Sequence, residues 1–171
     1  MDLRRVVVEV GADGRSRAGD VERPAGVFRF ADRRGADPHD LDGGRVDDFG
    51  PAAPGELVVA DLWRTGSEVP AGFDPSAGSE EFEVECPPGG SRWRLVEFGA
   101  GHDTPMHRTD TVDHDLIVAG EIELELEEGT VTLRPGDTVV IPGLVHAWHT
   151  GLEACTMAVL QIALGRSNGD S

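Results

Sequence analysis

The stretch that decides the fold is residues 101–149, which read GHDTPMHRTDTVDHDLIVAGEIELELEEGTVTLRPGDTVVIPGLVHAWH. It contains five of the six histidines, and its most regular pattern is residues 121–127, EIELELE. This alternation places Ile122, Leu124 and Leu126 on one face of a strand and the glutamates on the other. We interpret the glutamates as a solvated outer face rather than as metal ligands, because one face of an antiparallel sheet commonly stays in water.

Turn residues divide the chain into short apolar segments. Within and around the central stretch we expect strands at residues 93–98, 106–109, 114–119, 121–127, 130–133, 138–141, 146–149 and 154–164. Earlier strands are expected at residues 4–10, 27–30 and 56–63, with loops at 31–54 and 68–81. No useful length of the chain shows a helical period of 3.6 residues. Many short strands at this spacing predict an all-β sandwich or small barrel.

The length of 171 residues suits one domain with an extension. Pro87-Pro88-Gly89-Gly90 is the best candidate boundary. We therefore predict an N-terminal extension of short strands and loops at residues 1–90, a barrel core at residues 91–165 and a flexible tail at residues 166–171.

Composition excludes several classes of function. The net charge is −17, and a chain this acidic repels nucleic acid and anionic membranes, so neither is an expected partner. All 15 basic residues are arginine and there is no tyrosine, which excludes a Schiff-base lysine and a tyrosine general acid. His, Asp, Glu, Cys or a metal ion must carry any chemistry.

The ends and the cysteines add little chemistry. Cys86 and Cys155 have no CxxC spacing, and Cys155, within ACTMAVLQIAL, reads as a buried apolar residue. The N-terminal MDLRRVVVEV lacks the apolar core of a signal peptide, and no run approaches the length of a membrane span. We expect a cytoplasmic protein.

Three potential ligands lie at the ends of expected strands. His107 and Asp113 precede a run that ends at Gly120, and His146 follows the Pro142-Gly143 turn. A two-strand return would bring His146 beside the first two. Two imidazoles and a carboxylate from separate strands predict a divalent-metal site. His102 and His114 are possible third imidazoles, although His102 is expected in a loop and His114 on the opposite face from Asp113.

The spacing of these residues resembles the two motifs of the cupin superfamily. Gly101 is followed by five residues, His107-Arg108-Thr109, Asp113 after three more and Gly120 after a further six. The second motif is Gly136, five residues, Pro142-Gly143 and then His146. The resemblance covers about residues 91–164 and implies a cupin-type jelly-roll β-barrel carrying the N-terminal β/loop extension. Thr109 stands where cupins have a second histidine, Asp113 replaces a glutamate, and the second motif is one residue short.

By resemblance, His107, Asp113 and His146 bind a divalent metal ion, with Fe²⁺ favoured and Mn²⁺, Ni²⁺ or Zn²⁺ as alternatives. Thr109 is then the candidate catalytic residue, hydrogen-bonding substrate or a metal-bound water. Met106 and Trp148 are candidate pocket walls, with a plain core role as the alternative. A shorter Asp and a neutral Thr are equally compatible with a weakened or lost metal site.

The resemblance implies a small metal-dependent enzyme acting on a small organic acid or carbonyl compound, with oxygenase or lyase/isomerase-type chemistry. The arginine-only, Gly/Ala-rich composition suggests specialised bacterial metabolism. The alternative is a non-catalytic ligand-binding or sensory barrel with a degenerate metal site. Arg92, Arg94 and Arg108 are candidates for a substrate carboxylate, although solvated surface is the simpler expectation. We expect a small-molecule substrate and a homodimer, in which the N-terminal strands could pair.

Overall fold

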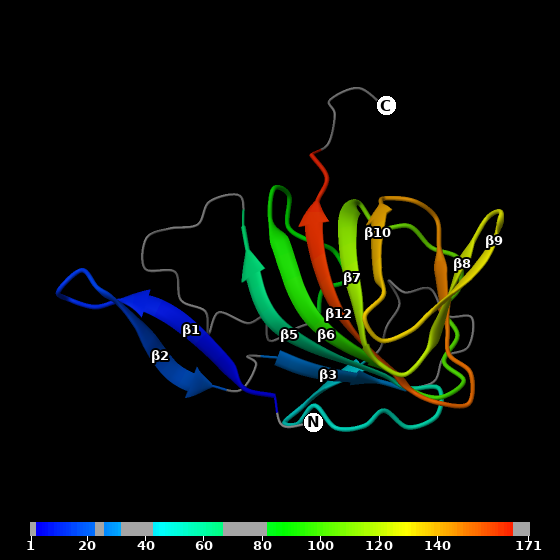
Figure 1. Ribbon diagram of the computed structural model, residues 1–171, viewed down its shortest axis with the longest axis horizontal. Coiled ribbons are helices and arrows are strands. Elements are labelled where there is room, and N and C mark those ends of the chain that lie inside the picture. The colour runs from blue at the N-terminus through cyan, green and yellow to red at the C-terminus, as the bar shows by residue number, and fades with distance from the viewer. Residues whose placement is uncertain (1–2, 23–25, 32–42, 67–81, 166–171) are drawn as a thin grey trace.

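The computed structural model describes residues 3–22, 26–31, 43–66 and 82–165, and these ranges contain strands and no helix (Figure 1). The all-β prediction is therefore confirmed. No helix in the described part of the chain is long and apolar enough to cross a membrane. The predicted tail at 166–171 and the whole loop predicted at 68–81 lie outside the described residues, as does His39, the one histidine outside residues 101–149.

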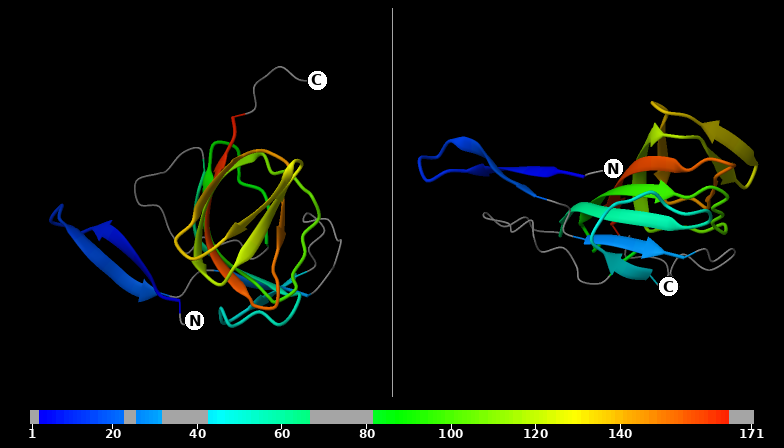
Figure 2. Two further views of the ribbon diagram at one scale, coloured as in Figure 1. Left: turned by 45° about the vertical axis from the view of Figure 1, so that its right-hand side comes forward. Right: turned by 90° about the horizontal axis from the view of Figure 1, so that it is seen from below.

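Two sheets wrap around a common core, as Figure 2 shows along the barrel. The large antiparallel sheet has the order β10 (Thr138–Pro142), β7 (Thr111–Ala119), β12 (Cys155–Ala163), β6 (Ser91–Phe98), β5 (Leu57–Thr65), β3 (Gly26–Phe30) and β4 (Gly43–Val46). The small sheet has the order β11 (Ala147–His149), β8 (Ile122–Leu126) and β9 (Gly129–Leu133). Strands on both sides of residue 90 thus share the large sheet, because β5 pairs with β6.

The main core lies between the inner faces of the two sheets. The alternation expected at residues 121–127 is present over most of its length, with Ile122 and Leu124 buried and Glu121, Glu123 and Glu127 exposed, whereas Leu126, expected on the inner face, is 37% exposed. Ile122 and Leu124 pack in one cluster with residues of the large sheet, among them Phe98, Met157 and Val159. The period of two therefore fixes which face of β8 closes the barrel.

A second core covers the outer face of β5. Val58 and Ala60 point away from the barrel interior and pack with Phe49 and Val46. The prediction of loop throughout residues 31–54 is wrong here, since Gly43–Val46 forms β4 and pairs with β3. The local sequence is polar and glycine-rich, and it becomes a strand because Val46 and Phe49 cover apolar residues far away in the chain.

Two other local predictions differ from the structure. Residues 106–109 do not form a strand and make only an isolated bridge, between His107 and His146. Pro105, which precedes them, lacks the N–H that a regular ladder needs. A strand is present at β2 (Ser16–Glu22), where none was expected, because it pairs with β1 (Arg5–Val10) as a hairpin.

The β1–β2 hairpin extends away from the barrel (Figures 1 and 2). Val6, Val8 and Val10 alternate along β1 and are 52%, 68% and 74% exposed. Val21, which pairs with Val6, is 52% exposed. One face of the hairpin is therefore a row of exposed valines, named the valine face below.

Candidate functional site

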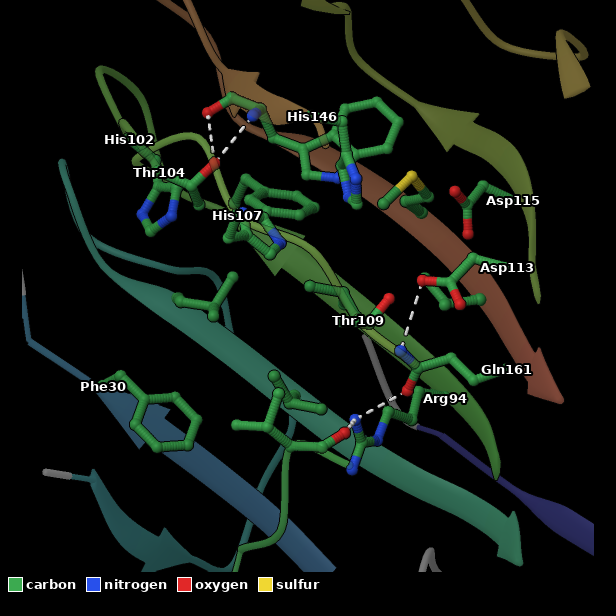
Figure 3. A pocket seen from close by; sticks show the side chains of 18 of the residues that line it. Phe30, Arg94, His102, Thr104, His107, Thr109, Asp113, Asp115, His146 and Gln161 are labelled. Atoms are coloured by element: carbon green, nitrogen blue, oxygen red, sulfur yellow. Dashed lines mark hydrogen bonds between the residues drawn. The ribbon is translucent and has the colours of Figure 1, made fainter. Parts of the chain in front are cut away.

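A cavity of about 150 Å³ opens between the sheets (Figure 3). Its walls come from the inner faces of β5, β6, β7 and β12 and from the loop at residues 102–107. Apolar side chains form most of the wall, including Phe30, Val59, Phe98, Met157 and Val159.

His107 and His146 lie side by side. Their backbones form two N–H···O bonds of 2.9 Å each, and their ring centroids are 4.5 Å apart. The return predicted from the sequence therefore brings the two imidazoles together. Nδ1 of His107 lies 2.9 Å from the carbonyl of Pro105, and Nδ1 of His146 lies 2.9 Å from the carbonyl of Leu144. Since a carbonyl can only accept, each Nδ1 carries the proton, and Nε2 is the nitrogen with a lone pair in the neutral ring.

Asp113 lines the same cavity and is held by its neighbours. The strand period puts Thr111, Asp113 and Asp115 of β7 on the inner face, where all are buried. The Thr111 hydroxyl lies within hydrogen-bond reach of Asp113 Oδ1 and is 2.9 Å from the hydroxyl of Thr109. Gln161 Nε2 donates to Asp113 Oδ2 over 3.3 Å. Both carboxylate oxygens of Asp113 are thus engaged by side chains of β7 and β12.

Arg94 holds the side chain of Gln161 by a hydrogen bond. Arg94 Nη1 donates to Gln161 Oε1 over 2.9 Å, and its Nε donates to Asp61 Oδ1 over 2.7 Å. Burial lowers the pKa of Arg94, and the charge of Asp61 opposes that shift. The buried guanidinium is therefore one half of an ion pair with Asp61.

The expectation that the candidate arginines are solvated surface is wrong for two of them. Arg94 and Arg92 are 5% and 1% exposed, and Arg92 pairs with Glu83 and, at 3.8 Å, with Asp61. Acidic partners from other segments allow these cations to be buried. Arg108 is exposed, 3.5 Å from Asp110.

Asp115 is the acid of the cavity whose pKa is shifted most. Its side chain is 4% exposed, and its Oδ1 has no hydrogen-bond partner among the described residues. Burial, followed by the charge of Asp113, raises the pKa of Asp115 to about 8. Asp115 is therefore mostly uncharged at neutral pH.

Of three other residues that the sequence singled out, only Trp148 lines the cavity. Trp148 is buried and lines the cavity, with its ring 5.9 Å from that of His146. Met106, predicted as pocket wall, is 39% exposed and lies outside the cavity lining, because Pro105 and His107 on either side of it face inward. His114 is exposed on the outer face of β7, as its alternation indicated.

His102 lines the cavity from its loop. Its Nδ1 lies 2.9 Å from the carbonyl of Gly55, and its ring packs on Phe98 with centroids 5.3 Å apart.

Sequence reasoning missed Thr111, Asp115 and Gln161. Thr111 and Asp115 share the period of two with Asp113, so a polar strip on an otherwise apolar inner face was available as evidence. Gln161 is a lone amide in the apolar run of β12. An amide buried in such a run needs a partner, which here is Asp113 together with Arg94.

Comparisons with known proteins agree with this architecture, although no family model matches the chain. A cupin-domain-containing oxidoreductase of Neurospora crassa is 30% identical over 96 residues, 53% of this chain and 49% of that protein. Oryzines biosynthesis cluster protein J of Aspergillus oryzae is 38% identical over 78 residues, 45% of this chain and 44% of that protein. Further matches, from two other fungi, also carry the name cupin-domain-containing oxidoreductase. The matched part of this chain is therefore similar to cupin-domain proteins.

The chain spans about half the length, or less, of the curated relatives that it matches. These relatives are fungal and do not support the bacterial origin suggested by composition. Among solved structures, the polyketide cyclase RemF of Streptomyces resistomycificus has a TM-score of 0.47 and 18% identity, over 67% of this chain and 72% of that one. The DMSP lyase DddQ of Ruegeria pomeroyi has a TM-score of 0.41 and 29% identity, over 47% of this chain and 41% of that one.

The cupin motif residues fit a divalent metal ion in part. The donor types are suitable, and the two imidazoles are adjacent with Nδ1 fixed on a carbonyl, as in metal-binding histidines. Asp113 lines the same cavity, yet in the described part of the chain no three His, Cys, Asp or Glu side chains gather closely enough to hold a metal ion. The histidine pair fits the ion, and Asp113 is instead held by Thr111 and Gln161.

Proposed function

We propose that this chain is a cupin enzyme that converts a small organic acid or carbonyl compound by oxygenase or lyase/isomerase-type chemistry. The observation that carries the proposal is the pair of oriented imidazoles, His107 and His146, in the wall of a mostly apolar cavity. The names of curated relatives, which include oxidoreductases and biosynthesis cluster proteins, support an enzyme of specialised metabolism.

A divalent ion, Fe²⁺ being favoured, would be held by His107 and His146, with Asp113 as the candidate third ligand. When bound, such an ion polarises a carbonyl or carboxylate oxygen of the substrate as a Lewis acid. The carbonyls of Pro105 and Leu144 hold the two rings in place. Thr109, which is buried beside Thr111, would donate a hydrogen bond to the substrate.

The second candidate is a non-catalytic small-molecule-binding barrel. The observation in its favour is that Thr111 and Gln161 already occupy both oxygens of Asp113. Such a site would bind a ligand through the cavity wall without metal-dependent turnover.

Metal content tests the first proposal. Protein purified without an affinity tag or chelator is expected to contain close to one divalent ion per chain, and His107→Ala or His146→Ala should remove it. His114→Ala is the matched control, because His114 lies on the outer face of β7 and should leave the metal content unchanged. A parent protein that holds no metal, even after anaerobic reconstitution, would reject the metal enzyme in favour of the binding barrel.

We also propose that the partner of this chain is a second copy. The support is the valine face of the β1–β2 hairpin, since a row of exposed apolar side chains on an extended arm indicates a protein contact. An isolated two-stranded hairpin is only marginally stable in water, so a dimer would stabilise it. The cytoplasmic location stays a prediction from the sequence.

A further inference from the structure

The cations near the cavity are already paired. Among the described residues that line the cavity, Arg94 is the one arginine, and Asp61 and Gln161 occupy its Nε and Nη1. Nη1 also donates to the backbone carbonyl of Val84, and Nη2 donates to the backbone carbonyl of Glu83. Arg92 lies behind it, paired with Glu83 and Asp61. The protein therefore offers a substrate carboxylate no available arginine in the described cavity wall.

Asp113 disfavours an anionic ligand in the cavity further. Asp113 lines the wall and is hydrogen-bonded by two neutral side chains, and no described arginine or histidine forms an ion pair with it. Like charges in a poorly hydrated site repel strongly. The chain as a whole carries a net charge of −17, which adds to this repulsion over longer distances.

The apolar wall and the volume set the size of the buried ligand. Phe30, Phe98 and Trp148 contribute aromatic surface, and Met157 and Val159 contribute aliphatic surface. A cavity of about 150 Å³ matches the space that one benzene ring fills in a protein interior. Larger ligands would extend through the open side and bury one ring.

Asp115 supplies one polar contact within this wall. Asp115 is only 4% exposed, and Figure 3 shows its carboxyl directed into the cavity beside Asp113. Its Oδ1 lacks a hydrogen-bond partner within the described residues. A buried carboxyl oxygen without a partner costs stability, so a ligand that hydrogen-bonds to it gains binding free energy, and an N–H donor can pair with it whether or not the carboxyl is ionised.

We propose that the cavity binds an uncharged ligand whose buried part is about one aromatic ring, carrying a hydrogen-bond donor directed at Asp115. This deepens the proposed function, since it assumes that the cavity is the ligand site and narrows the substrate to a neutral carbonyl compound. A free carboxylic acid would bind only if a metal ion supplied the positive charge that the wall lacks.

Three ligands of nearly the same shape test the proposal. Benzamide is neutral and has N–H donors, acetophenone is neutral without a donor, and benzoate is an anion. Metal-free protein at about pH 7.5, where ordinary histidine is mostly neutral, is titrated with each ligand while backbone amide shifts of β7 and β12 are followed by NMR. We expect benzamide to bind at least about tenfold more tightly than benzoate, and more tightly than acetophenone.

Two variants assign the donor contact to Asp115. Asp115→Leu should lower benzamide affinity about tenfold and acetophenone affinity less, since benzamide can both donate to and accept from the Asp115 carboxyl whereas acetophenone can only accept. Asp115→Asn keeps a carbonyl acceptor and should retain the preference for benzamide. Acetophenone binding that is retained in Asp115→Leu also reports that the cavity is still folded.

Each contrary result overturns a stated part of the proposal. Benzoate binding as tightly as benzamide overturns the exclusion of anions. Equal affinity for benzamide and acetophenone in the parent, or benzamide affinity that survives Asp115→Leu, overturns the role of Asp115. No shift with any ligand overturns the size class. Because all titrations use metal-free protein, these results are independent of whether the metal proposal succeeds.

Discussion

At the scale of single residues, the cavity holds two carboxyls with different hydrogen-bond environments. Asp113 receives hydrogen bonds on both oxygens, whereas Asp115, two positions along the same strand, has one oxygen without a partner among the described residues. Burial raises the pKa of Asp115 to about 8. A group in this position weakens the fold as it ionises, and it persists where a ligand contact compensates.

The stability of the metal-free protein should therefore decrease as pH rises toward 8. The folded pKa of Asp115 lies above its ordinary value of 3.8, so between these values the folded chain binds more protons than the unfolded chain. This contribution is complete below about pH 4 and is lost as pH rises through about 8, with a slope of up to about 1.4 kcal/mol per unit. Urea unfolding from pH 5 to 8.5 should show the slope in the parent and a flatter curve in Asp115→Asn. Parallel curves would contradict the assignment to Asp115.

At the scale of the elements, two glycines of the first motif, Gly101 and Gly120, have a positive φ. Gly120 closes β7 with a φ of +77°, and a Cβ there would lie 2.1 Å from the carbonyl oxygen of Ala154. Gly101 opens the first motif with a φ of +67°, but no described atom lies within 4 Å of its ideal Cβ. At both positions the positive φ would strain a residue with a Cβ, but only Gly120 also lacks the space for one.

Alanine at the two glycines should separate these effects. Gly101→Ala should lower the free energy of unfolding by about 1–2 kcal/mol, the cost of a left-handed alanine. Gly120→Ala should cost roughly 1–3 kcal/mol more, because β12 must also move away. Equal losses in denaturant unfolding would show that the Ala154 carbonyl shifts freely.

The isolated β-bridge between His107 and His146 shows how tertiary contacts can override a local strand pattern. The sequence of residues 106–109 predicted a strand, yet the segment is a loop after Pro105, held by one pair of backbone bonds to His146. The loop conformation also changes which side chains of this segment face the cavity. Met106 faces outward and Pro105 lines the cavity, a reversal that no periodicity in four residues can reveal.

At the scale of the whole molecule, the valine face gives the dimer proposal its test. Light scattering after gel filtration is expected to give twice the chain mass for the parent. A Val8→Glu and Val10→Glu double variant should give the mass of one chain, since both positions lie on the valine face. Val131→Glu is the control, because Val131 is 48% exposed on β9 in the small sheet. A monomeric parent would refute the proposal.

Local sequence was sufficient for the barrel and for the histidine pair. The alternation of residues 121–127 fixes the inner face of β8, and the turn at Pro142-Gly143 returns His146 toward His107. These features depend on a strand period of two and on turn chemistry, which act over a few residues. The resemblance to the two cupin motifs rests on the same short-range spacing.

Only the tertiary structure decided the charge and polarity of the cavity. Arg94 reads locally as a surface arginine, and it is buried because Asp61 and Gln161 approach from β5 and β12. Asp115 gains its raised pKa from burial and from Asp113, and Asp113 is held by Gln161, 48 residues away. Burial and pairing of charges depend on which strands become neighbours, so a local pattern carries no record of them.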